Sequence, residues 1–392
     1  MQINADAGLL QLPRSLALSA ALAPLEQAVD ACSTLRARLR TVPYRDSLMR
    51  AESRLDALAL ALPQPSAARH ELPGGFGGTA SDNLLRLLVL EASEDRAAPR
   101  SLRPSVNGVA AFELGLQRVR ANGTGALTAG LLQDLHRLLF LGLGESGSTS
   151  AGIALSDGRR REPGWSGDGQ VPSRVQPGAG LQDLERFLLD PPRLPLPVRM
   201  ALVVAKVECL SSFDQGSRQL AWLLMPLMTA AENRPPLFVA QTLAARREHY
   251  ETALAGLRST GDWEAWVGFF LQRLAEAADG ATARLDRTEG LQRARAADLF
   301  SLRSDSTARR LAELALGVPV LTVGAAQTML GVSFQTANAA VATLQRLGIV
   351  TPHSSNRRNR IFIVSGTLAT LTGGSWAPTG FADLAAAGAE AI

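Results

Sequence analysis

Two amide side chains, Gln335 and Asn338, lie three residues apart in a segment that follows Ser333. At this spacing the two amides can share one face of a helix, and Asn or Gln can form two hydrogen bonds with the edge of an adenine in the DNA major groove. Serine is a residue type that caps helix N-termini. We therefore predict a helix that starts at Ser333 and places five DNA-binding residues against double-stranded DNA: Ser333, Gln335, Thr336, Asn338 and Arg346.

The opposite face of this helix is apolar. Its residues recur at three- and four-residue spacing, as in a helix with one buried side: Ala337, Ala340, Val341, Leu344 and Leu347. Upstream, Gly331 can supply the positive backbone angle of a turn between two helices, and Ala326 is small enough to let the first helix approach the second. This order of elements is that of a helix-turn-helix motif.

A hairpin is predicted after this motif. Two short apolar runs flank a polar and basic tip from Ser354 to Arg360. Arginines in such a wing contact phosphates and position a protein on DNA without reading its sequence. We assign this role to three arginines: Arg357, Arg358 and Arg360. The alternative is a winged helix used only for protein contacts, with these arginines in a solvated turn.

The positive charge of the chain is concentrated in this segment. The 392 residues carry a formal net charge of +4. Residues 300–363 alone contain seven arginines and two acidic residues, which gives +5. The rest of the chain is therefore slightly negative, and the basic excess lies where the nucleic-acid-binding module is predicted.

The residues before this segment are predicted to be helical, because apolar residues recur at helical spacing and strand-like alternation is scarce. We expect helices over these ranges: 106–120, 128–140, 181–189, 197–210, 219–230, 242–257 and 263–278. Residues 142–180 are rich in Gly, Ser and Arg and leave room only for a short β-hairpin. The predicted fold class is mainly α: a helical bundle, with this hairpin, followed by a winged helix-turn-helix domain.

Composition excludes several classes of protein. Two cysteines make neither a disulfide framework nor a zinc site, and no apolar run is long enough to span a bilayer. We expect a cytoplasmic protein with no metal, no cofactor and no membrane partner.

A second set of residues lies in the loop Ser211-Ser-Phe-Asp-Gln-Gly-Ser-Arg218. With the flanking stretches 135–140, 201–213, 250–254 and 261–271, this loop resembles the Fic (filamentation-induced-by-cAMP) family of AMP-transferring enzymes. The catalytic loop of that family reads His-Pro-Phe, two residues, then Gly-Asn-Gly-Arg. The resemblance implies that the histidine position is that of a general base, that an acidic residue holds magnesium, and that the glycine-rich turn cradles phosphates.

The loop departs from the family motif at the positions that do chemistry. Phe213 matches the aromatic residue and Arg218 the arginine, but Ser211 stands in place of the histidine, and a hydroxyl is no base at neutral pH. The stretch between Phe213 and Arg218 is also one residue short. The other positions of this degenerate motif are Asp214, Gly216 and Ser217. We therefore predict no catalytic residue and no AMP transfer.

Three interpretations of the loop stay open. It is a helix-capping turn without a ligand, a nucleotide or small-molecule pocket that senses without reacting, or a catalytic site that uses a different base. The inhibitory helix of the family carries Ser, three residues, Glu and Gly. Its best counterpart here is the stretch 52–57, where Asp56 stands for the glutamate one residue early.

These observations predict five segments: an N-terminal helical region (1–127), a degenerate Fic-like core (128–278), a connecting helix (279–298), a winged helix-turn-helix domain (299–372) and a tail (373–392). The predicted function is a DNA-binding transcriptional regulator whose inactive Fic-like domain serves for dimerisation or ligand sensing. Its expected partners are double-stranded DNA, a second copy of the chain, and a small-molecule or nucleotide effector. The alternative is an active Fic-type AMP transferase with a regulatory winged helix, which needs a base near Phe213; the sequence places none in the loop.

Overall fold

The structure is a computed structural model that describes residues 11–61, 80–93, 98–143, 179–210, 213, 216–353 and 360–373. The described residues form fifteen α-helices and three short strands, so the prediction of a mainly helical fold is confirmed. The chain divides into two compact units. Unit 1 contains Met1–Thr41, Ser53–Gly75 and Ala97–Thr282, and unit 2 contains Val42–Glu52, Phe76–Arg96 and Ala283–Ile392.

Unit 1 is built from helices alone in its described part. They are α1 (Leu22–Leu39), α4 (Arg103–Asn122), the 3-10 helix η1 (Gly123–Ala126), α5 (Ala129–Leu139), α6 (Ala179–Leu189), α7 (Leu196–Glu208), α8 (Ser217–Ala231), α9 (Ala240–Ala245) and α10 (Arg247–Thr260). Two further helices, α2 (Arg45–Leu60) and α11 (Trp263–Arg295), contribute residues to both units.

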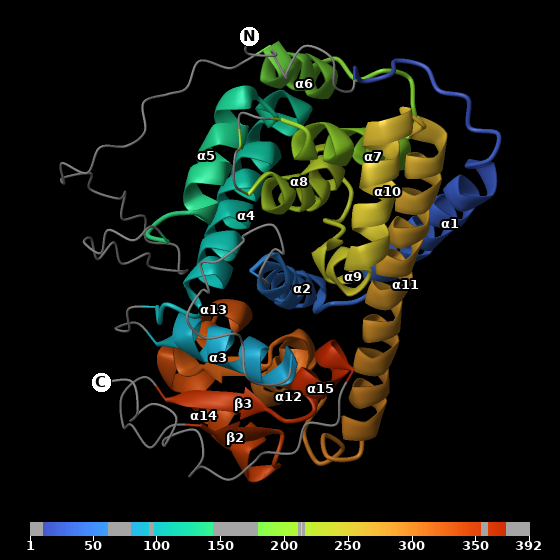
Figure 1. Cartoon of the computed structure of the whole chain (residues 1–392). Helices are drawn as coiled ribbons and strands as arrows, with labels where there is room; N and C mark the ends of the chain where they lie inside the picture. The colour runs from blue at the N-terminus through green and yellow to red at the C-terminus, as the bar shows by residue number, and fades with distance from the viewer. Residues whose placement is uncertain are drawn as a thin grey trace. The chain divides into compact units, whose positions relative to one another are not determined.

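Helices α7 and α8 form the centre of unit 1 because they are apolar nearly all round, and every residue from Met200 to Val207 is buried. In Figure 1 the two helices lie between α4 and α5 on one side and α10 and α11 on the other. The indole Nε1 of Trp266 on α11 donates to the carbonyl oxygen of Ala201 on α7 at 2.8 Å. On α4, a Cβ at Gly115 would lie 2.5 Å from Cδ1 of Leu227, so α4 approaches α8 closely at this glycine.

Most of the predicted helices are present, but two differ in extent. The helix expected over 242–257 is interrupted at Arg246, where the backbone leaves the helical region (φ −114°, ψ 30°), and becomes α9 and α10. The helix expected to end at Ala278 continues to Arg295, because no proline intervenes and a glycine inside a helix costs only about 1 kcal/mol. The expected limit between 278 and 279 therefore falls inside α11, and the other segment limits stay predictions. Residues 144–178, which include most of the expected hairpin, lie outside the described residues.

Unit 2 combines helices with a small sheet. Its elements besides the shared helices are α3 (Ala80–Ala92), α12 (Thr307–Leu314), the 3-10 helix η2 (Ala315–Gly317), β1 (Val320–Thr322), α13 (Val323–Leu330), α14 (Phe334–Arg346), β2 (Val350–Pro352), β3 (Ile361–Val364) and α15 (Thr367–Thr372). The strands are antiparallel in the order β1-β3-β2, with Val320 opposite Ile363 and Val350 opposite Val364. One hydrophobic core joins α12, α13, α14 and the sheet through residues such as Leu311, Ala326, Val341 and Phe362.

Residues from the first hundred positions complete unit 2. Helix α3 packs against β1 and α15, and the hydroxyls of Ser81 and Thr372 lie 2.6 Å apart. A Cβ at Gly317 would lie only 2.6 Å from the backbone nitrogen of Leu48. The segment 299–372 is therefore not a self-contained body, because α3 and the residues around Leu48 cover part of its surface.

Candidate functional site

Helix α14 begins where its sequence predicts. The Ser333 hydroxyl oxygen accepts a hydrogen bond from the backbone N–H of Thr336 at 3.2 Å and caps the helix. Gly331, which ends α13, has a φ of +65°, a conformation that favours glycine. The turn and the cap thus place the polar side of α14 directly after α13.

The predicted DNA-contacting residues of α14 differ in exposure. Gln335, Thr336 and Arg346 are exposed, and Asn338 is half-buried. Four residues of the predicted apolar stripe are buried: Ala337, Ala340, Val341 and Leu344. Phe334, the first residue of the helix, is 58% exposed although it is aromatic. The exposed side of α14 is therefore a mainly polar surface with two small alanines, Ala339 and Ala342, and one large apolar side chain at its N-terminal end.

Arg360, which directly precedes β3, reaches this surface. Its Nη2 donates to Oδ1 of Asn338 at 2.8 Å, and its guanidinium carbon lies 5.5 Å from the ring centroid of Phe362. The sequence suggested separate roles for Arg360 and Asn338, but the structure brings the two side chains together. Arg357 and Arg358 lie outside the described residues.

The carboxylates of this basic segment are already engaged. Asp305 pairs with Arg303 at 3.6 Å, and Glu313 pairs with an arginine one turn earlier on α12 at 3.9 Å. Among the described residues, no carboxylate pairs with the exposed guanidinium groups of Arg310, Arg346 or Arg360. These three arginines are therefore the exposed, described cations of the segment that have no carboxylate partner among the described residues.

The loop 211–218, which resembles the Fic motif in sequence, is described in part. Ser211, Asp214 and two neighbouring residues lie outside the described residues. Gly216 is the N-cap of α8 with a φ of +86°, and Ser217 is the first residue of that helix. A Cβ at Gly216 would lie 2.0 Å from the ring of Phe140, so only glycine fits there.

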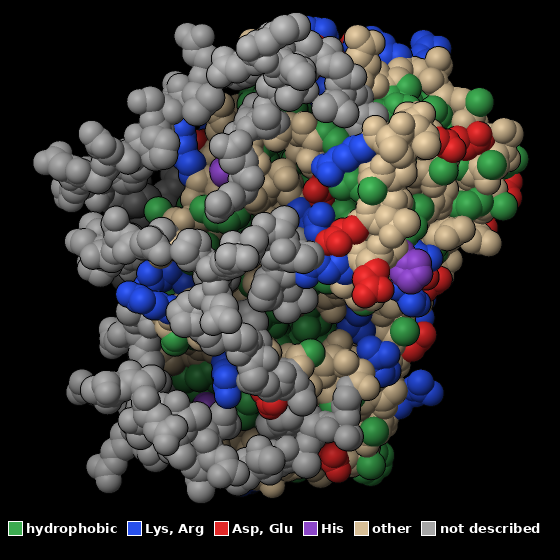
Figure 2. Space-filling view, viewed as in Figure 1, with side chains coloured by type: hydrophobic (Ala, Val, Ile, Leu, Met, Phe, Trp, Pro, Cys, Tyr) green, Lys and Arg blue, Asp and Glu red, His purple; other side chains and the backbone are tan. Residues whose placement is uncertain are grey.

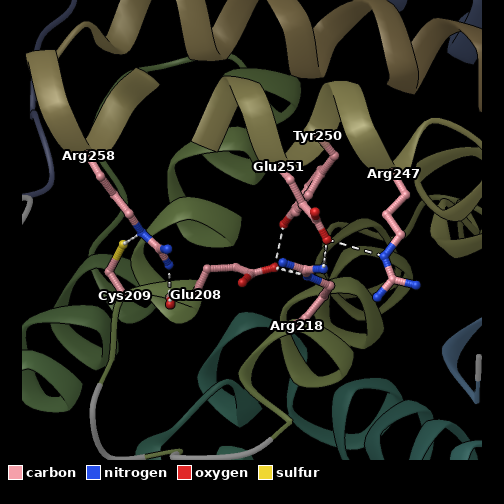
Figure 3. Close-up of polar contacts among 7 residues, drawn as sticks. All are labelled: Glu208, Cys209, Arg218, Arg247, Tyr250, Glu251 and Arg258. Atoms are coloured by element: carbon pink, nitrogen blue, oxygen red, sulfur yellow. Dashed lines mark hydrogen bonds and ion pairs between the residues drawn. The ribbon is translucent and has the colours of Figure 1, made fainter. Parts of the chain in front are cut away.

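Arg218 is held by two carboxylates (Figure 3). Its Nε donates to Oε1 of Glu208 at 2.9 Å, and its Nη1 donates to Oε1 of Glu251 at 3.0 Å. The hydroxyl of Tyr250 donates to the same oxygen of Glu208 at 2.7 Å, and Arg247 donates to Glu251 at 3.2 Å. We call Glu208, Arg218, Tyr250 and Glu251 the Arg218 cluster.

The surroundings of the Arg218 cluster shift the pKa of three of its members, Arg218, Tyr250 and Glu251. Burial alone would lower the pKa of Arg218, but the carboxylate of Glu208 outweighs this effect and the pKa is raised. Burial, reinforced by Glu208, raises the pKa of Tyr250 well above its ordinary value. Burial would raise the pKa of Glu251, but hydrogen bonds from Arg218 and Arg247 lower it. An arginine compensated by two carboxylates attracts a phosphate weakly, because the carboxylates repel the incoming anion.

Figure 2 shows acidic and basic side chains next to one another over the surface of α10. This agrees with the i, i+4 pair of Arg247 and Glu251 and with the partly exposed side chain of Glu251. The rim of the Arg218 cluster is thus mixed in charge.

A histidine lies beside the loop although it is distant in sequence. The ring centroids of His136 on α5 and Phe213 are 4.9 Å apart, and those of His136 and Phe140 are 5.1 Å apart. His136 is half-buried, whereas Phe213 is 5% exposed. The loop 211–218 itself contains no histidine. In the structure, His136 of α5 lies next to the loop residue Phe213.

Asp56, matched by sequence to the inhibitory glutamate of the Fic family, makes a contact within the fold. Its side chain is buried, and its Oδ1 accepts a hydrogen bond from the backbone N–H of Ala240 at 2.7 Å, at the start of α9. A carboxylate at a helix N-terminus satisfies an otherwise unpaired donor. Asp56 therefore has a structural contact that explains its burial.

Sequence reasoning missed the partners of Arg218. Glu208 and Tyr250 lie in stretches that resemble the Fic family, but only the folded chain shows that they meet. The available signals in the sequence were a glutamate at the end of a mostly apolar helix and a tyrosine in the stretch 250–254. Among the described residues, no group of three or more His, Cys, Asp or Glu side chains is placed to hold a metal ion.

No family model matches the chain, and no curated protein matches it. Among solved structures, a Fic family protein from Desulfovibrio desulfuricans G20 is similar, with 16% sequence identity and a TM-score of 0.44. The alignment covers 90% of this chain and 98% of that one. A likeness of this size does not assign a family. None of the described helices has both the length and the apolar character to cross a bilayer.

Proposed function

We propose that this protein is a DNA-binding transcriptional regulator that uses a winged helix-turn-helix module at α12–β3. The observation that carries the proposal is the polar side of α14, which follows a glycine turn and a serine cap. A helix with such a side fits the major groove, where its N-terminal residues contact base edges. In this arrangement Gln335 and Thr336 point to the bases.

Two arginines on α12 and α14 have no carboxylate partner in the described part of the chain. Arg310 on α12 and Arg346 at the end of α14 are exposed, and each phosphate they neutralise releases condensed counterions from the DNA. The predicted wing residues Arg357 and Arg358 add to this charge. The binding free energy is therefore expected to depend strongly on salt.

The direct test uses the full chain, because α3 and the residues around Leu48 belong to unit 2. Random duplexes are incubated with the protein over a salt series and the bound fraction is sequenced. The proposal predicts salt-dependent binding and enrichment of a defined motif. A protein that binds no duplex at low salt contradicts the proposal. So does a variant with both Arg310 and Arg346 replaced by glutamine whose affinity depends on salt concentration as steeply as that of the wild type.

For unit 1 we propose a non-catalytic role in ligand sensing or dimerisation. Arg218 supports this view, because the arginine at the motif position is engaged by Glu208 and Glu251. Sedimentation of the protein at micromolar concentration tests dimerisation, and thermal unfolding with and without nucleotides tests ligand sensing. Both roles are contradicted if the protein is a monomer and no nucleotide changes its melting temperature.

A second candidate function is AMP transfer with His136 as the base, favoured by its contact with Phe213. Incubation with labelled ATP, magnesium and a cell lysate distinguishes the two functions. We expect no labelling above a control without protein. Reproducible labelling that His136→Gln abolishes and Gln335→Ala leaves unchanged would establish the enzyme instead.

A further inference from the structure

The arginine at the base of the wing is fixed in orientation by two contacts. Arg360 donates to the amide oxygen of Asn338, 22 residues earlier on α14. Its guanidinium plane also lies near the ring of Phe362. Phe362 is 1% exposed in the central strand β3, opposite Leu321 of β1. The side chain of Arg360 is thus anchored both to the helix and to the sheet.

Such anchoring is not needed for a phosphate contact. A phosphate presents several oxygens, so an arginine can reach it from many orientations, and such a contact positions the protein without reading sequence. Reading a base is different, because the planar guanidinium must present two N–H groups to O6 and N7 of a guanine. An arginine already held in one orientation loses less rotamer entropy when it makes those two bonds.

The amide of Asn338 is placed to orient rather than to read. A bidentate contact with adenine uses the Asn oxygen as an acceptor and the Asn nitrogen as a donor. That oxygen accepts a hydrogen bond from Arg360 in this structure. The guanidinium has five N–H donors, of which this bond uses one. Among the described residues no second hydrogen-bond acceptor contacts Arg360.

We propose that Arg360 is the specificity-determining residue that reads a guanine, and that Asn338 is the positioning residue that orients it. The proposal rests on the proposed DNA-binding function. It reverses the roles that the sequence suggests, since there the asparagine reads a base and the arginine contacts phosphate.

The test is selection of duplexes from a random library by the full-length protein, followed by affinity measurements on the selected and a random duplex across a salt series. Arg360→Lys keeps the positive charge but removes the planar fork. We expect this variant to keep the salt slope, to lose the preference for guanine at one position of the motif, and to reduce the ratio of specific to random affinity on the order of tenfold to a hundredfold.

Two further variants separate orientation from charge. Asn338→Ala should weaken the same guanine position while every arginine is retained. Arg346→Gln is the matched control, because it removes an exposed arginine from the same helix. This control should lower the salt slope by roughly 0.9 and leave the motif unchanged. Thermal unfolding of each variant checks that the fold is intact.

The possible results are distinct. A guanine preference that is reduced in both Arg360→Lys and Asn338→Ala supports the proposal. A motif that Arg360→Lys leaves unchanged overturns it, as does loss of an adenine preference in Asn338→Ala with the guanine retained. If the wild-type protein enriches no duplex at all, the proposed function fails, and the role of Arg360 fails with it.

Discussion

Replacing Arg218 tests whether this arginine stabilises the fold or is available to bind a ligand. The side chain is 17% exposed and Glu208 only 5%, so Arg218→Met leaves the Glu208 carboxylate buried without its cation. Removing one partner of a buried ion pair costs about 3–5 kcal/mol of the free energy of unfolding. For a domain of 150–250 residues this lowers the melting temperature by about 6–20 °C.

The matched control is Glu251→Gln. The side chain of Glu251 is 37% exposed, and Arg247 shares it with Arg218. Exposed ion pairs contribute about 0–1 kcal/mol, so this variant should stay close to the wild type. The double variant Arg218→Met/Glu208→Gln should recover part of the loss, because it removes the uncompensated charge.

Thermal unfolding followed by tryptophan fluorescence measures these effects, because Trp222 and Trp266 are both buried in unit 1. The pH dependence adds a check with a defined sign. Since the pKa of Glu251 is lowered from its ordinary 4.5, its contribution is present above pH 4.5 and is lost as the pH falls through the lowered value. A melting temperature for Arg218→Met equal to that of the wild type would refute the structural role of Arg218.

Three further predictions concern other parts of the chain. Gly317→Ala should destabilise unit 2 by about 1–3 kcal/mol, because the new Cβ would meet the backbone of Leu48. Gly324→Ala is the control, because no atom lies nearer than 3.9 Å to its new Cβ. Equal midpoints of urea unfolding for the two variants would contradict this prediction. Burial raises the pKa of the Cys32 thiol from 9.0 to about 11. In a variant with no other thiol, alkylation of Cys32 at pH 8 should therefore be about 100-fold slower in the folded protein than in the protein unfolded in urea. Equal rates in the two states would argue against the raised pKa. Ser333→Ala should cost about 1 kcal/mol through loss of the helix cap, measured by chemical denaturation, and an unchanged stability would show that the cap contributes nothing.

The features of the fold that local sequence determines could be predicted. Ser333, Gly331 and the apolar stripe of α14 act over a few residues, so spacing and residue type were sufficient to place the turn, the cap and the buried side. The interruption at Arg246 was not predictable, since neither proline nor glycine marks it. The start of α11 at Trp263 was predicted, but the joining of the expected helices 263–278 and 279–298 into one helix was not.

The candidate sites depend on contacts between distant residues, and those could not be predicted. Arg218 meets Glu251 across 33 residues, and Arg360 meets Asn338 across 22. Helical periodicity shows which side of a helix is buried but not which side chain of another element lies against it. His136 likewise reaches Phe213 only because α5 passes beside the loop.

The early residues that belong to unit 2 have a consequence for synthesis on the ribosome. Ser81 of α3 contacts Thr372, 291 residues later. At 5–20 residues per second, α3 is translated about 15–60 s before this partner. During that interval the apolar side chains of Leu84, Leu85 and Leu87, all buried in the finished protein, have no C-terminal elements to cover them. The contact between α3 and α15 can therefore form only after the ribosome has synthesised Thr372, and until then this apolar side of α3 stays without its partners in unit 2.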